Sequence, residues 1–493
     1  MEAISPSGKH GILLDIAVKA MKDRGFEPGF PTQALKQLEE IHEPSGAEVG
    51  PLKDMTGLLW CSIDNDDSKD LDQLSVGEKL PDGRVKVYVA VADVDALVKR
   101  GTPLDQHAQK NTTSVYTGIK TFPMLPEKLS TDLTSLNENQ KRVALVVEMT
   151  VDGEGRVAES AVYRAWVENK AQLTYNAVGA WLEDKRPLPP AAARVPGMDT
   201  QLKLQDDAAQ RLRNLRHEHG ALELETLQPR PVTKDGEVID LALEFKNRAG
   251  ELIEDFMIAA NGITARFLTQ AGFPTLRRVV RIPKRWDKIV SVAEGLGEKL
   301  PGEPDSKALN DFLARQRKKD PLRFPDLSLT VVKLLGRGEY VPEAPGDKPL
   351  GHFGLAVRDY NHSTAPNRRY PDLITHRLLK AALAKAPTPY SREELSSLAA
   401  HCTAQEDAAD KVERQVRKSA SALFLSKRIG EYFEAIVTGA SDKGIWVRLL
   451  KPAVEGKLVQ GAHGLDVGDR LRVKLIEVNV EQGWIDFANA GRH

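Results

Sequence analysis

Hydrophobic residues recur at helical spacing in two short segments near the N-terminus. In residues 11–24, Ile12 and Ile16 lie four positions apart, and a glycine follows directly as a helix stop. Residues 32–42 (TQALKQLEEIH) repeat the pattern. The two helices predict a small helical unit over residues 1–50 that resembles a helix-turn-helix. Such a unit is more often a packing module than a DNA reader, so we expect no groove contact from it.

Further along, the pattern changes to β-rich runs on either side of an acidic loop. Residues 58–63 (LLWCSI) and 85–98 (VKVYVAVADVDALV) are rich in β-branched and aromatic side chains, as strands are. Mixed strands and helices predict one large α+β domain over residues 51–428. Helical patterns in it lie around residues 201–218, 251–269, 305–318, 369–386 and 391–428.

The C-terminal segment reads as short strands punctuated by glycine. This spacing predicts a five-stranded barrel of the OB type over residues 429–493, and the exposed strand face of such barrels binds oligonucleotides. Phe433 and Trp446 are its candidate stacking faces. Either aromatic ring could instead belong to the barrel core.

Composition narrows the class of protein without deciding it. A chain of 493 residues is too long for one core, and its 41% hydrophobic and 28% charged residues are ordinary for a globular protein. The net charge of −1 argues against histone-like binding but leaves room for locally clustered cations. Cys61 and Cys402 form no C-x-x-C pair. With no membrane-length apolar run and no signal-peptide pattern, we expect a cytoplasmic protein, and a monomer.

The segment with the most chemistry is SIDNDDSKDLDQLSV, residues 62–76. It holds five aspartates within nine positions, directly after a run that reads as a buried strand. Clustered carboxylates repel one another unless water or cations neutralise them, and hard oxygen ligands suit Mg²⁺ or Mn²⁺. The aspartates are Asp64, Asp66, Asp67, Asp70 and Asp72.

Two other interpretations of this loop exist. An acidic loop is commonly a solvated turn. A calcium-binding EF-hand is the other candidate, because Asp64, Asp66 and Ser68 alternate as its first ligands do. Lys69 stands where that loop needs glycine, and Ser75 where it needs a bidentate glutamate, so the EF-hand interpretation fails.

The order Ile63-Asp64, Asp70, Asp72 resembles the metal-binding motif of the ribonuclease II/R family. That resemblance implies a catalytic domain with four metal-binding aspartates. Gln73 occupies the fourth position here, and an amide oxygen can coordinate a metal but supplies no negative charge. The resemblance therefore implies Asp64, Asp70, Asp72 and Gln73 as metal ligands, with Mg²⁺ or Mn²⁺ as the cofactor.

The resemblance continues through residues 87–152, with the Pro-Met-Leu-Pro and Ser-Leu-Asn landmarks of the family at 123–126 and 135–137. The family tyrosine that matches Tyr116 stacks on a terminal base. An aromatic face can stack on any base, which suits an enzyme indifferent to sequence. Taken alone, a tyrosine between turn residues is more often a half-buried packing group.

Residues 252–268 also match the family. On a helix, Ile253 and Phe256 would lie on an apolar face, and Asp255 would begin the exposed side. The resemblance implies that Asp255 contacts the terminal ribose, although aspartate is shorter than the usual glutamate. A solvated helix face is the alternative.

Residues 352–379 resemble the family segment Thr-Ser-Pro-Ile-Arg-Arg-Tyr-Pro-Asp, with Ala365 in place of Ser and Asn367 in place of Ile. Arg368 falls on the family's catalytic arginine, and an arginine at a turn entering a helix can present its planar fork to a phosphate. Arg369 is a further candidate for RNA contact. A structural salt bridge is the alternative for either arginine.

KVERQVRK, residues 411–418, resembles a late family helix whose glutamate, here Glu413, faces the site. We expect a supporting role for Glu413, such as orienting Arg368, with a surface pair to Arg417 as the alternative. The basic segments 277–288 and 314–323 are candidates for contacts to the RNA backbone. Charged surface helices explain such segments at least as often.

The resemblance covers about residues 55–490 and implies a processive, two-metal 3′-to-5′ exoribonuclease that converts single-stranded RNA to 5′-monophosphates. The first 50 residues depart from the family pattern, which typically carries two cold-shock barrels there. One rival is a catalytically impaired family member that binds RNA without cutting it, motivated by Gln73. A second rival is a translation-associated RNA-binding protein, which would leave the acidic loop without a role.

Overall fold

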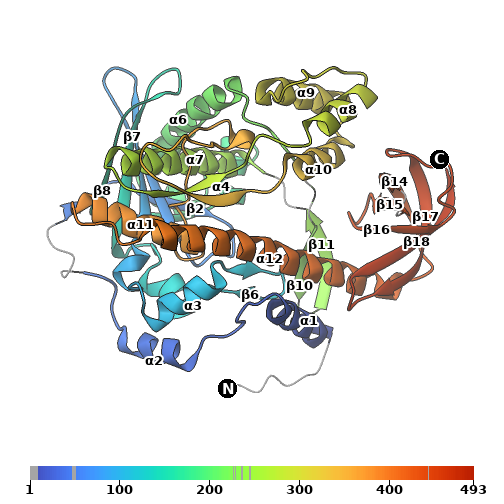
Figure 1. Cartoon of the computed structure of the whole chain (residues 1–493), viewed down its shortest axis with the longest axis horizontal. Coiled ribbons are helices and arrows are strands. Elements are labelled where there is room, and N and C mark those ends of the chain that lie inside the picture. The colour runs from blue at the N-terminus through green and yellow to red at the C-terminus, as the bar shows by residue number, and fades with distance from the viewer. Residues whose placement is uncertain are drawn as a thin grey trace.

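The computed structural model describes residues 9–46, 52–225, 227, 229–234, 237–243, 246–441 and 444–492. The fold is mixed α+β with a C-terminal barrel, as the sequence predicts (Figure 1).

A seven-stranded mixed sheet forms the centre of the large domain, in the order β1-β8-β7-β4-β3-β2-β9. The middle strands pair antiparallel, whereas β9 joins β2 in parallel. The strands are β1 (Lys53–Asp54), β2 (Cys61–Asp64), β3 (Gln73–Lys79), β4 (Val85–Ala92), β7 (Lys141–Val151), β8 (Val157–Glu168) and β9 (Ala171–Thr174).

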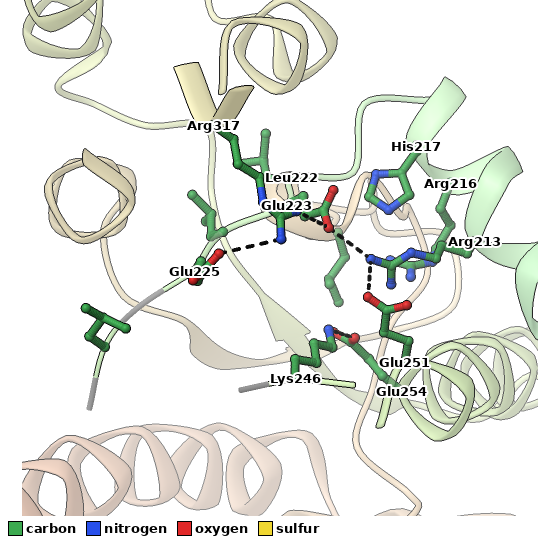
Figure 2. A pocket seen from close by; sticks show the side chains of 13 residues that line it. Arg213, Arg216, His217, Leu222, Glu223, Glu225, Lys246, Glu251, Glu254 and Arg317 are labelled. Carbon is green, nitrogen blue, oxygen red and sulfur yellow. Dashed lines mark hydrogen bonds and ion pairs between the residues drawn. The ribbon is translucent and has the colours of Figure 1, made fainter. Parts of the chain in front are cut away.

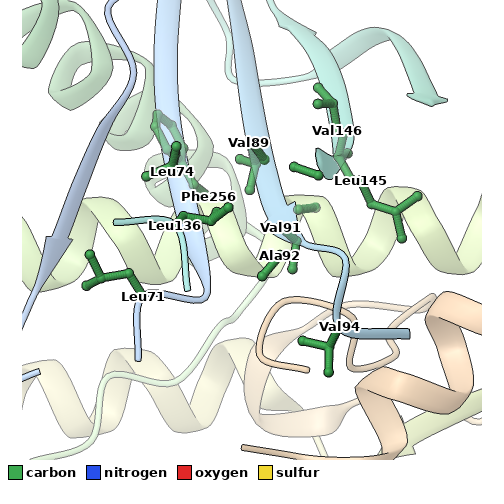
Figure 3. Packing of buried hydrophobic residues seen from close by; sticks show 14 of the residues in the cluster. Leu71, Leu74, Val89, Val91, Ala92, Val94, Leu136, Leu145, Val146 and Phe256 are labelled. Atoms are coloured by element: carbon green, nitrogen blue, oxygen red, sulfur yellow. The ribbon is translucent and has the colours of Figure 1, made fainter. Parts of the chain in front are cut away.

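Strand β4 shows how the sequence pattern reflects the burial of this sheet. Its sequence VKVYVAVA is nearly continuous in apolar residues, and all but one of its residues are buried. A strand has this pattern when both sheet faces are covered. Figure 3 shows Val89 and Val91 of β4 with Phe256 of the helix that crosses the sheet, within the largest hydrophobic core.

Helices cover the sheet and connect the large domain to the barrel (Figure 1). The longest, α12 (Arg392–Leu425), begins with a capping box between Ser391 and Glu394. The other helices of this domain are α3 (Pro103–Asn111), α4 (Tyr175–Leu182), α5 (Pro190–Ala193), α6 (Met198–Glu218), α7 (Arg248–Gln270), α8 (Trp286–Gly295), α9 (Ser306–Lys319), α10 (Phe324–Leu335) and α11 (Tyr370–Leu383).

Three two-stranded sheets complete the large domain as far as the structure describes it. Each pairs two strands antiparallel. The pairs are β5 (Val115–Tyr116) with β6 (Thr121–Phe122), β10 (Pro229–Lys234) with β11 (Glu237–Leu243), and β12 (Thr275–Val279) with β13 (Glu339–Glu343).

Both predicted N-terminal helices are present, as α1 (Lys9–Asp23) and α2 (Thr32–Glu40). Helix α1 packs on α12, where Ala17 and Met21 join a core with Val412 and Val416. Helix α2 packs instead on α3. Among the described residues, the two helices thus pack on different parts of the large domain, unlike a helix-turn-helix pair.

The C-terminal segment closes into the predicted barrel, in the order β14-β15-β16-β18-β17. Alternate residues fill its interior, with Val473 and Leu475 inside and the intervening Lys474 exposed. The strands are β14 (Tyr432–Ser441), β15 (Gly444–Leu449), β16 (Glu455–Gln460), β17 (Arg470–Asn479) and β18 (Trp484–Arg492).

Candidate active site

The acidic loop connects the end of β2 to the start of β3, so it lies at one end of these two strands. Asp64 is the last residue of β2, and Gln73 is the first of β3, opposite Val91. Between them, the backbone carbonyl of Asp72 accepts a hydrogen bond from Ala92 N at 2.9 Å, which fixes the return of the chain. The loop therefore carries its carboxylates just beyond the strand ends.

Asp64 is braced from within the loop. Its Oδ1 accepts hydrogen bonds from Asn65 N at 2.7 Å and from Ser68 Oγ at 3.0 Å. Burial raises the pKa of Asp64 in spite of these donors, and it likewise raises the pKa of Asp70. The two carboxylates also repel each other, which raises the pKa of Asp70 further.

Asp72 is the most enclosed of the three, at 3% exposure. Its Oδ1 accepts a hydrogen bond from Asn367 N at 3.0 Å, and its Oδ2 lies 3.5 Å from Arg368 Nε. Burial raises the pKa of Asp72 to about 7, with Arg368 opposing and Asp70 adding to the shift. Proton affinity this high in a carboxylate means that the site favours an additional positive charge.

A tight turn presents Arg368 to the acidic loop. The backbone N–H groups of Arg368 and Arg369 both donate to Ala365 O, at 3.3 and 3.0 Å. The backbone carbonyl of Arg368 accepts a hydrogen bond from Ser114 N at 3.0 Å. The Arg368 side chain is 43% exposed. Its guanidinium opposes the burial that raises the pKa of all three aspartates, so one half-exposed cation interacts with three carboxylates.

Tyr116 lies at the rim of this cluster. Its ring is 42% exposed, and its hydroxyl is 3.5 Å from Asp70 Oδ2. Glu413 Oε1 accepts a hydrogen bond from Tyr116 N at 2.8 Å. Glu413 thus holds the β5–β6 hairpin, whereas the sequence suggested that it orients Arg368. A hollow of about 460 Å³ adjoins the ring, lined also by Pro231 and Arg417.

Tyr175 belongs to the same neighbourhood, and sequence reasoning missed it. It follows β9, which pairs with β2 so that Thr174 lies opposite Asp64. Burial raises the pKa of Tyr175, the Asp64 charge raises it further, and Arg368 opposes the shift. Only the pairing of β2 with β9, two strands more than a hundred residues apart, brings Tyr175 close to Asp64. The pattern of hydrophobic and polar residues does not reveal this pairing.

The structure does not bring Asp255 to the acidic cluster. The expectation that Asp255 begins an exposed helix side is wrong, because the residue is 2% exposed and pairs with Arg216 of α6. Burial raises its pKa to about 6, against the effect of that arginine. Its contact with a ribose stays a prediction.

Beside Asp255 lies a second hollow of about 460 Å³ between α6, α7 and α9 (Figure 2). Charged side chains of both signs line it. Figure 2 shows Arg213 between Glu223 and Glu251, with ion pairs of 3.3 and 3.0 Å. Arg317 pairs with Glu223 at 2.8 Å.

Arg369 and Phe433 do not face open space as RNA contacts would. Arg369 donates to Asp372 Oδ1 at 2.8 Å, which is the salt bridge offered as its alternative. The stacking role expected for Phe433 is corrected because its ring is 6% exposed in the barrel core, with Arg428 over it. Strand alternation turns the neighbouring Tyr432 outward instead, at 50% exposure.

Trp446 is half-buried and lines a groove of about 470 Å³ on the outside of the barrel. Trp484, which sequence reasoning missed, lines the same groove at 63% exposure. Lys457 lies 5.9 Å from the Trp446 ring, and Lys418 of α12 forms the far wall. The groove thus combines two aromatic faces with two cations.

The two basic segments are largely ion-paired within the protein. Arg277 pairs with Glu343 at 2.7 Å, and Arg315 with Glu298 at 2.5 Å. These pairs fit the alternative of charged structural segments.

The donor set of the acidic loop suits a hard divalent cation. Across the described residues, no three His, Cys, Asp or Glu side chains meet as a ready-made metal cage. Mg²⁺ is commonly held by one or two carboxylates together with water and substrate phosphate, so these buried, mutually repelling aspartates fit such an ion.

Two family models match this chain. Residues 52–385 match the RNB domain, and residues 431–490 match the RNase II-type exonuclease C-terminal S1 domain. The chain belongs to the RNB family. Members of the RNB family are 3′-to-5′ exoribonucleases that generally depend on divalent metal ions.

The chain is 30% identical to Ribonuclease R of Aquifex aeolicus, an RNB relative. The alignment covers 97% of this chain and 70% of that protein. The structure of Mycoplasma genitalium RNase R in complex with ribose-methylated single-stranded RNA matches with a TM-score of 0.88 at 25% identity, over 97% of this chain and 78% of that one. Yeast Ssd1, described as a pseudonuclease, shares the fold at a TM-score of 0.70 and 16% identity, over 89% of this chain and 55% of that one. Within the described residues, no helix is long and apolar enough to cross a membrane.

Proposed function

We propose that this RNB protein removes nucleotides one at a time from the 3′ end of single-stranded RNA and releases 5′-monophosphates. The observation that carries the proposal is the group formed by Asp64, Asp70 and Asp72 around the half-exposed Arg368, with Tyr116 at the rim. Carboxylates that suit a divalent metal ion, beside a half-exposed guanidinium and an exposed aromatic ring, support phosphodiester hydrolysis of a nucleic acid. An RNA substrate is consistent with the cytoplasmic location expected from the sequence.

The roles of the residues follow from their chemistry. Asp64, Asp70, Asp72 and the amide oxygen of Gln73 would hold Mg²⁺ or Mn²⁺. When two such ions are bound, they supply a lowered pKa for the attacking water and stabilisation of the leaving 3′ oxygen. Arg368 would balance charge on the phosphate oxygens, because its side chain is 43% exposed beside the loop.

Tyr116 would hold the terminal base. Its exposed ring can stack on any base, and Glu413 keeps the hairpin in place through the Tyr116 amide. Stacking fixes the last nucleotide beside the carboxylates, so cleavage would advance by one nucleotide at each step. Asp255 remains a candidate for the ribose only if RNA binding separates it from Arg216.

The barrel would guide the strand toward the catalytic domain. Trp446 and Trp484 offer stacking faces, and Lys457 and Lys418 offer charge for the phosphates. Since Arg417 lines the hollow beside Tyr116 and the adjacent Lys418 lines the barrel groove, α12 connects the two places. Binding through such cations should weaken as salt concentration rises.

The test is incubation of the purified protein with 5′-labelled single-stranded RNA and Mg²⁺ or Mn²⁺. We expect a ladder that shortens from the 3′ end, and no ladder with Asp72→Asn or with EDTA. A second candidate function is RNA binding without cleavage, which Gln73 favours and for which the pseudonuclease Ssd1 offers a precedent on the same fold. Intact RNA in every lane, with a gel shift retained, would establish that alternative.

A further inference from the structure

The turn that carries Arg368 is held at both ends by one buried carboxylate. Asp372 is 0% exposed in the first turn of α11. Its Oδ1 accepts hydrogen bonds from Ala365 N and from the Arg369 guanidinium, each at 2.8 Å. Ala365 begins the turn and Arg369 ends it, so a single oxygen atom links the two ends alongside the backbone hydrogen bond from Arg369 N to Ala365 O.

What lies inside this turn is the part that meets the acidic loop. Asn367 N donates to one oxygen of Asp72, and Arg368 Nε lies beside the other. A change in the turn would therefore move the guanidinium and the amide together. The arginine side chain is half-exposed, so its direction depends on how firmly its own backbone is held.

The chemistry of Asp372 suits a positioning role more than a contribution to stability. A buried ion pair such as Asp372–Arg369 gives little net free energy of folding, because removing both charges from water offsets their attraction. The helix N-terminus favours the negative charge where it stands. The main effect of the pair is consequently geometric.

We propose that Asp372 is a positioning residue that, by closing the Ala365–Arg369 turn, aims Arg368 at the substrate phosphate. This inference rests on the catalytic role proposed for Arg368. Asp372 itself touches neither the acidic loop nor the place of the substrate. Its hydrogen bonds act through the turn, and its charge also raises the pKa of Asp72 directly.

The experiment is a double-mutant cycle measured by single-turnover release of the first nucleotide at saturating enzyme. Asp372→Asn keeps the shape but removes the charge that holds Arg369, and we expect the rate to fall about 10- to 100-fold, as for other supporting groups, with RNA affinity unchanged. In the Arg368→Ala background the same change should lower the rate about threefold or less, because the group it aims is gone. An equal fold-loss in both backgrounds would overturn the inference.

Controls separate positioning from general destabilisation. Asp206→Asn removes a comparable buried partner of an arginine, since Asp206 accepts from Arg248 at 2.8 and 2.6 Å, and it should lower the melting temperature without changing the rate. If Asp372→Asn does not fold, Arg369→Lys weakens the same closure from the other side and should give a smaller loss that again disappears with Arg368→Ala. Full activity of Arg368→Ala alone would refute the proposed function, whereas an impaired Arg368→Ala beside an unimpaired Asp372→Asn refutes only the positioning role.

Discussion

The acidic loop and the charged hollow beside α7 contain similar side chains in opposite arrangements. In the loop, Asp64, Asp70 and Asp72 share the single guanidinium of Arg368, and burial raises the pKa of each carboxylate. In the hollow, the arginines and glutamates alternate. Arg213 lies between two glutamates, and burial does not prevent the pKa of Glu223 from falling below its ordinary value, because Arg317 and Arg213 oppose the effect.

This difference in charge balance distinguishes a candidate metal site from a cluster of ion pairs that serves the structure. Where each charge has a partner of opposite sign, the protein needs nothing further, and the hollow is explained by the packing of three helices (Figure 2). Where carboxylates outnumber cations and are shielded from water, a cation from outside lowers the free energy. Volume does not make this distinction, because the hollow beside Tyr116 and the hollow beside α7 are equally large.

The largest expected effect comes from removing the Arg368 guanidinium, which lies beside Asp72 of the acidic loop. Arg368→Ala leaves the phosphate charge unbalanced and should lower the single-turnover rate about 100- to 1,000-fold, about 3–4 kcal/mol of transition-state stabilisation. Metal affinity should rise or stay unchanged, since a competing positive charge is lost. A rate within threefold of wild type would remove Arg368 from the mechanism.

The loop and its arginine illustrate what sequence reasoning could reach. The five aspartates clustered in one loop pointed to a metal site from the residues alone, but the choice of Asp64, Asp70 and Asp72 among them came from the family resemblance. Arg368 lies almost three hundred residues from Asp72 and was found only through a family resemblance. Tyr175 required the β2–β9 pairing, which local patterns do not contain.

Two predictions, the exposed side chain of Asp255 and the stacking role of Phe433, failed for different physical reasons. The helical period of α7 correctly placed Asp255 beside the apolar face, but α6 covers that side and contributes Arg216. In the barrel, adjacent aromatic residues face opposite sides of β14, and a shift of one residue decides which is inside. Tyr432 faces out and Phe433 faces in.

A second prediction adds charge to the loop instead of removing it. Gln73→Asp restores a fourth carboxylate and should raise the apparent affinity for Mg²⁺ about tenfold, roughly 1.4 kcal/mol. Isothermal titration and the Mg²⁺ dependence of the rate would measure it. Gln73→Glu, which adds the same charge on a longer side chain, controls for geometry. Unchanged Mg²⁺ dependence in both variants would mean that this position does not contact the metal.

A third prediction concerns the stability of the metal-free protein against pH. The pKa of Asp72 is raised to about 7 in the fold, whereas an unfolded aspartate titrates near 3.9. Between these values only the folded protein keeps the proton. The contribution of Asp72 to the free energy of unfolding is therefore fully present below about pH 4 and is lost as pH rises through about 7.

Melting temperatures in EDTA from pH 5 to pH 8 would measure this loss. The advantage of Asp72→Asn over wild type should grow with pH, because the amide never ionises. At pH 8, Mg²⁺ should raise the melting temperature of the wild type toward that of the variant. It should change the melting temperature of the variant little. A constant difference across the range would contradict the raised pKa.

The smallest effect is expected in the hollow beside α7. Glu251→Gln removes one of the two close glutamate partners of Arg213 and leaves Glu223 in place. Partly exposed ion pairs contribute about 0–1 kcal/mol, so the melting temperature should fall slightly and the single-turnover rate should stay within about twofold. A loss comparable to that of Arg368→Ala would show that the paired hollow takes part in the reaction, and the distinction between balanced and unbalanced charge would then fail as a guide to the active site.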